Sequence, residues 1–147
     1  MKHALLIIWM LSISVLLSCK NRKTDSTELL QGLTKQEQVV YRRLMAVHDS
    51  AMAKMGAIER AIQTLQRIKS AGNESADFKS GIDSSILLLK RADEAMWDWM
   101  YHFKQKVDWS GKGTYLSYLQ AEERKIHRVA ALIDSALQRA SQYTNKE

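Results

Sequence analysis

The sequence predicts an all-α protein, an antiparallel up-down-up bundle of three long helices. The chain contains no proline and only 6 glycines among 147 residues, and good helix formers such as Ala, Leu, Met, Gln, Glu, Lys and Arg dominate its composition. Along three segments, apolar residues recur at alternating steps of three and four, which is the period of one face of a helix. Short glycine-containing breaks separate these segments, and short connections make consecutive helices antiparallel neighbours.

The first helix is expected to begin at Thr34, because "TKQE", Thr34 to Glu37, has the spacing of a capping box. Its apolar stripe consists of Tyr41, Met45, His48, Met52, Met55, Ile58, Ile62 and Leu65. This near-heptad spacing predicts one continuous helix. The helix is expected to end around Gly72 and Asn73, since both residue types tolerate the backbone conformation of a helix C-terminus.

The second helix is expected to start near Ser75 or Asp77, and Gly81 leaves its first turn free to fray. Its apolar stripe consists of Phe78, Ile82, Ile86, Leu89, Ala92, Met96, Trp99, Met100 and Phe103. The next break is "DWSGKGT", Asp108 to Thr114, which holds two glycines.

The third helix is expected from about Thr114 to Tyr143. Its stripe consists of Tyr115, Leu119, Glu122, Ile126, Val129, Ile133, Leu137 and Ala140, in which Glu122 is the strongest departure from apolar character. Each of the three helices has about 30 residues and is therefore about 45 Å long. The pattern leaves open whether two copies pair into a larger bundle, so dimerisation is compatible with it but not required.

The N-terminus, "MKHALLIIWMLSISVLLSCKNRK", has the organisation of an export signal. A basic head is followed by an apolar stretch that is too short to span a bilayer comfortably. Leu16 to Cys19 resembles the bacterial lipobox, which implies cleavage before Cys19 and attachment of lipid to its sulfur. We therefore expect a lipoprotein signal peptide at 1–18, a lipidated cysteine and polar tether at 19–33, and the bundle domain at 34–147.

Cys19 is the only cysteine in the chain, which excludes an intramolecular disulfide and metal sites built on several thiolates. An uncleaved anchor helix, or an ordinary secretory signal with a chance cysteine, is the weaker alternative to lipidation. The residues directly after Cys19 are basic. Surface-exported lipoproteins of Bacteroidetes-type bacteria usually carry an acidic run there, so we expect a periplasm-facing anchor in the outer membrane or cell envelope.

The helix directions place His48 in one layer with Met96 or Trp99, and with Glu122 or Ile126. This layer has two interpretations. In the first, which we favour, a buried His48 hydrogen-bonds Glu122 as a core polar pair, and the methionines fill irregular space between helices. The protein then needs no cofactor.

In the second interpretation the same layer binds copper. The candidate ligands are His48, Met52, Met96 and Met100. Thioether and imidazole groups are suitable ligands for Cu(I), so the chain would be a small periplasmic metal-binding protein.

Trp97 and Tyr101 lie four residues apart on a face of the second helix other than its apolar stripe. They are expected to be partly exposed, either as a surface for a partner or the membrane, or as a cover for the end of the bundle. No nucleophile–base pair, glycine-rich phosphate loop or His-x-x-x-His pattern occurs, so we expect no enzyme.

The net charge of +6 is spread along all three helices, which is typical of a solvated surface with at most mild attraction to anionic lipid. Nucleic acid is not an expected partner, because the signal directs the chain away from it.

Three stretches, "MAVHDSAMAKMGAI", "ADEAMWDWMYHF" and "YLQAEERKI", together resemble a group of short Bacteroidetes lipoproteins, often labelled viral A-type inclusion proteins. The resemblance implies a lipobox and a helical domain, and it brings no activity. Ala53 stands where many relatives would have proline, which predicts a straighter first helix. The expected function is that of a lipid-anchored envelope bundle with a binding or structural role, involving a protein partner or self-association.

Overall fold

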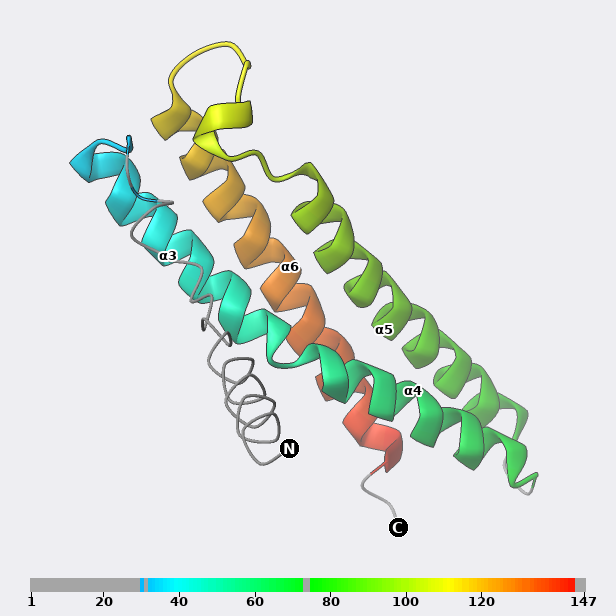
Figure 1. Ribbon diagram of the computed structural model, residues 1–147. Helices are drawn as coiled ribbons and strands as arrows, with labels where there is room; N and C mark the ends of the chain where they lie inside the picture. The colour runs from blue at the N-terminus through cyan, green and yellow to red at the C-terminus, as the bar shows by residue number, and fades with distance from the viewer. Residues whose placement is uncertain (1–29, 31, 73–74, 145–147) are drawn as a thin grey trace, which may run out of the picture. The chain divides into compact units, whose positions relative to one another are not determined.

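The computed structural model describes residues 30, 32–72 and 75–144, and this part of the chain contains helices and no strands. The elements are α3 (Lys35–Met52), α4 (Met55–Ser70), α5 (Ala76–His102), a short 3-10 helix η1 (Lys106–Asp108) and α6 (Tyr115–Thr144). Together α3 and α4 form one long bent helix that packs with α5 and α6 (Figure 1). The predicted three-helix architecture is confirmed.

The described helices belong to a unit that spans Leu33–Glu147. The expected signal peptide, Cys19 and nearly all of the tether lie outside the described residues. Among the helices that are described, none combines the length and the apolar character needed to cross a membrane.

The helix ends follow the predicted capping chemistry. The Thr34 hydroxyl accepts a hydrogen bond from the Glu37 N–H, and the Glu37 carboxylate accepts one from the Thr34 N–H, 2.7 Å away. The Ser75 hydroxyl accepts from the Phe78 N–H at the start of α5. Gly72 follows α4 with a φ of +95°, a conformation that glycine adopts without strain.

The expectation of one straight helix through Ala53 is wrong. The helix ends at Met52 and resumes at Met55, with Ala53 and Lys54 forming the turn between them. Before the bend α3 packs on α6, whereas after it α4 packs on both α5 and α6. The apolar spacing continues unbroken across the turn, so it conceals the change in axis direction.

Large aromatic rings fill the space between α3 and α5. The backbones of these two helices pack less closely than those of α3 and α6. The Trp99 indole lies 5.4 Å from the His48 ring, and the Phe103 ring lies 6.3 Å from the Tyr41 ring, measured between ring centroids. The expected layer of His48 with Trp99 is therefore present.

A second group of rings fixes the loop between α5 and α6. Trp109 packs on Tyr115 and Tyr118, whose rings stack with centroids 5.5 Å apart. The Tyr118 hydroxyl accepts from the Lys104 N–H, and the Tyr115 hydroxyl donates to the Lys104 carbonyl. Burial raises the pKa of both phenols above the ordinary tyrosine value.

Candidate functional site

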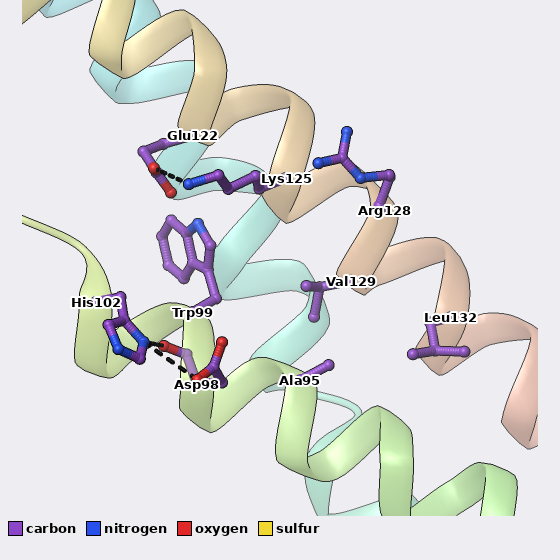
Figure 2. Close-up of a pocket in the computed structure, with 9 residues that line it drawn as sticks. All are labelled: Ala95, Asp98, Trp99, His102, Glu122, Lys125, Arg128, Val129 and Leu132. Carbon is purple, nitrogen blue, oxygen red and sulfur yellow. Dashed lines mark hydrogen bonds and ion pairs between the residues drawn. The ribbon is translucent and has the colours of Figure 1, made fainter.

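A groove of about 550 Å³ runs between α5 and α6 (Figure 2). Its apolar lining consists of Ala95, Trp99, Val129 and Leu132, and its polar lining consists of Asp98, His102, Glu122, Lys125 and Arg128. A concave site with an apolar base and a few polar groups is the usual form of a small-ligand site. The groove is therefore the candidate functional site.

Trp99 is a buried part of this lining. Its side chain is buried, with only 6% exposed, and its ring packs against His48 and Phe103. The indole nitrogen lies on the edge of the ring that faces the Glu122–Lys125 pair (Figure 2). Among the described residues, Nε1 of Trp99 is the one buried side-chain nitrogen or oxygen without a hydrogen-bond partner. Such a group costs about 1–3 kcal/mol when it stays unpaired.

The charged residues of the groove differ in whether they have a hydrogen-bond or ion-pair partner. The Lys125 ammonium donates to the buried Glu122 carboxylate at 2.6 Å. His102 Nδ1 lies 2.9 Å from the Asp98 carbonyl oxygen and 3.1 Å from its carboxylate. Within residues 32–72 and 75–144, Arg128 has neither a hydrogen bond nor an ion pair, and no dashed line reaches it in Figure 2.

The expected hydrogen bond between His48 and Glu122 is replaced, among the described residues, by two separate pairs. Glu122 accepts from Lys125 on its own helix, and His48 Nδ1 lies 2.9 Å from the carboxylate of its neighbour Asp49. The Trp99 ring explains this, because it packs against His48 and also lines the groove that contains Glu122.

The candidate copper ligands all lie in the hydrophobic core or against it. Met96 is fully buried, while Met52 and Met100 are half-buried and pack against the core cluster. The His48 side chain is 14% exposed. No group of three or more His, Cys, Asp or Glu side chains able to hold a metal occurs in the described part of the chain. Methionine is not among these four residue types.

Trp97 and Tyr101 lie on the outer face of α5, with 54% and 80% of their surface exposed. The Tyr101 ring meets the His102 ring edge-on at 5.1 Å. Because His102 lines the groove, the exposed aromatic pair lies beside the groove rim. Its exposure agrees with the sequence expectation, and its role as a partner surface stays a prediction.

Sequence reasoning missed the groove itself. Lys125 and Arg128 follow Glu122 by three and six residues on the same helix, and that spacing was a usable signal of a charged rim. Neither the family models, nor the curated proteins, nor the solved structures compared with this chain yield a match.

Proposed function

We propose that this chain is a lipid-anchored protein of the bacterial cell envelope whose helical bundle binds a partner and performs no catalysis. The anchor part of the proposal rests on the lipobox-like sequence that ends at Cys19 and on the resemblance to short Bacteroidetes lipoproteins. The binding part rests on one observation, the exposed aromatic pair Trp97 and Tyr101.

The aromatic pair supports binding because it is exposed while the neighbouring rings of Trp99 and Phe103 pack together. Trp99 is buried and Phe103 is half-buried, whereas Trp97 and Tyr101 remain in water. Tryptophan and tyrosine are enriched at protein interfaces and among the residues that dominate binding energy. A rigid helix presents the two rings together, so little conformational entropy is lost when a partner binds.

Fractionation tests the anchor. The wild-type protein is expected to incorporate labelled palmitate and to sediment with membranes, while Cys19→Ala loses the label and the membrane association. Protease added to intact cells is expected to leave the protein whole until the outer membrane is permeabilised, because the bundle faces the periplasm. A Cys19→Ala protein that stays with the membrane would contradict the anchor.

Photo-crosslinking in the native envelope tests the partner surface. A photoreactive amino acid at position 101 is expected to yield a discrete adduct, either with another protein or with a second copy of the chain. The same group at Gln66, which is exposed on α4, serves as the control. Replacing Trp97 with alanine is expected to lower the yield from position 101 by about tenfold, as for a binding hot spot. Equal yields from both positions would reject the surface.

A second proposal is Cu(I) binding by the ligands named above, and one contact favours it. The Asp49 carboxylate holds His48 Nδ1, an arrangement that orients metal-binding histidines through their second nitrogen and leaves Nε2 for the metal. Titration with Cu(I) against a competing chelator is expected to show one site that His48→Ala removes. His127→Ala, at an exposed position on α6, should leave it intact. Equal binding by both variants, or none by the wild type, ends this proposal.

A further inference from the structure

We propose that the α5/α6 groove binds an amphiphile with one anionic head group and one apolar chain. The inference goes beyond the function proposed above, because it depends neither on lipidation of Cys19 nor on a protein partner. It rests on three features of the groove: an apolar lining, an unpaired arginine, and a buried donor without an acceptor.

The apolar part of the groove suits a hydrocarbon chain. Val129 and Leu132 line it from α6, one turn apart, and Ala95 lines it from α5 (Figure 2). Ala95 is small, so it leaves open the space that a larger side chain would fill. The volume of about 550 Å³ lies within the range of about 300–1,000 Å³ that is usual for small-ligand sites.

The polar part favours an anion over a cation. Both carboxylates already have partners, since Glu122 accepts from Lys125 and Asp98 pairs with His102. Arg128 is the lining residue with a full charge and no partner among the described residues. A guanidinium binds carboxylate and phosphate oxygens through two parallel hydrogen bonds. An anionic head group can therefore pair with the free guanidinium of Arg128. A cationic head group would have to displace Lys125 or His102 from its carboxylate partner.

The indole of Trp99 points to the same kind of ligand. Its Nε1–H is a donor without an acceptor, and buried donors normally have one. The unmatched polar groups of the groove, Arg128 and the indole, are thus both donors, and the atom they lack is an oxygen acceptor. Because solvent does not reach Nε1, a ligand acceptor contacts it only after neighbouring side chains move.

Photoaffinity labelling of the full-length protein in membranes tests the proposal. One arm uses a diazirine-bearing fatty acid, a second uses a diazirine-bearing lysophosphatidate, and a third uses the matching uncharged fatty alcohol. We expect mass spectrometry to find adducts on α5 and α6 residues of the groove with one or both anionic probes, and about tenfold fewer with the alcohol. Labelling by the fatty acid indicates that the groove accepts a carboxylate head group, and labelling by the lysophosphatidate indicates that it accepts a phosphate head group.

Two variants make the result specific to the groove. Arg128→Gln is expected to lower the labelling about tenfold, the loss expected for one charge-assisted hydrogen bond. Arg124→Gln removes the same charge from an exposed position one turn earlier on α6, outside the groove, and should label like the wild type. Ala95→Phe, which fills the apolar part, is expected to abolish groove labelling while circular dichroism remains helical.

Several results would overturn the proposal. Absence of groove adducts with both anionic probes rejects it, as does labelling by the alcohol that equals labelling by the acids. Equal labelling of Arg128→Gln and Arg124→Gln rejects the role of the arginine. Unchanged labelling of Ala95→Phe shows that the adducts come from the surface, not from the groove.

Discussion

His48 and Glu122 illustrate how polar side chains in this bundle choose their partners. Their expected layer around Trp99 forms, yet each pairs with a residue close by in the sequence, Asp49 or Lys125. A neighbour on the same helix is already in place once the helix forms, whereas a cross-bundle pair also requires the helix axes to align. The Glu122–Lys125 pair was therefore predictable from its three-residue spacing, while the His48–Asp49 pair and the position of the indole were not.

Gly81 is a residue whose role depends on a distant side chain. A Cβ at this position would overlap the hydroxyl and ring of Tyr143, which packs edge-on against Phe78. Glycine to alanine within a helix ordinarily stabilises by about 0.5–1 kcal/mol. Gly81→Ala is instead expected to destabilise the protein by about 1 kcal/mol, because the Tyr143 ring must move away.

In a Tyr143→Ala background, Gly81→Ala is expected to stabilise the protein by about 0.5–1 kcal/mol, the usual gain when alanine replaces glycine within a helix. Urea unfolding of the two single variants and the double variant measures this coupling. An identical effect of Gly81→Ala in both backgrounds would mean that the two side chains do not compete for space.

Glu37 links the start of α3 to the α5/α6 loop. Burial alone would raise its pKa, but hydrogen bonds from Lys106 and Thr34 and the lysine charge outweigh burial, so the pKa lies below its ordinary value. The carboxylate therefore stabilises the fold above its ordinary pKa of 4.5, and this contribution is lost as the pH falls through the lower folded value.

Glu37→Gln is expected to lower the free energy of unfolding by about 1 kcal/mol at pH 7, since it removes a charge-assisted hydrogen bond. The difference from wild type should shrink as the pH falls through the lowered folded pKa, where the wild-type carboxylate also becomes protonated. Urea unfolding at pH 7 and pH 3 measures it, with exposed Glu94→Gln as the control. A deficit of the same size at both pH values would refute the proposed ionic contribution.

At the scale of elements, the turn at Ala53 and Lys54 shapes the molecule. It leaves α3 on α6 and directs α4 across α5 and α6 (Figure 1). The separation of α3 from α5 is filled by Trp99 and Phe103, and the first of these also lines the groove.

Proline substitution distinguishes the turn from a helix interior. Ala53 has a φ of −60°, which suits proline. Proline at this position would remove the hydrogen bond that the Ala53 N–H donates to the Asp49 carbonyl. Ala53→Pro is therefore expected to cost about 1–2 kcal/mol. Ala46→Pro, at an exposed position inside α3, should cost about 3 kcal/mol or more. Urea unfolding compares them, and equal costs would mean that the long helix is continuous in solution.

At the scale of the whole molecule, one core holds α3, α4, α5 and α6 together. Buried apolar side chains recur at the predicted positions on α4, α5 and α6, among them Leu65, Leu89 and Ile133, all with 0% exposure. On α3 the buried face differs from the predicted stripe, since it includes Val40, Leu44 and Ala51 in place of Met45, His48 and Met52. The stripes read from the sequence therefore predicted most of the core. Their meeting along the bundle axis is what gives the molecule its stability, because burial of apolar surface is the main favourable contribution to folding.

Substitution of two leucines on α5 tests which face of this helix packs against the core. Leu89 is fully buried, whereas Leu87 is 51% exposed. Leu89→Ala is expected to destabilise the fold by about 2–5 kcal/mol through lost burial and a residual cavity. Leu87→Ala should change stability by less than about 0.5 kcal/mol. If chemical denaturation ranked the two in the opposite order, α5 would present a different face to the core.

The sequence by itself determined the helical class, the capped start at Thr34, and the inward faces of α4, α5 and α6. These features depend on residues within a few positions of one another, and helix periodicity and capping act over that range. Only the tertiary structure decided the bend after Met52, the groove beside Trp99 and the contact between Gly81 and Tyr143. Each of these depends on the directions of helix axes, which are set when side chains distant in the sequence pack together.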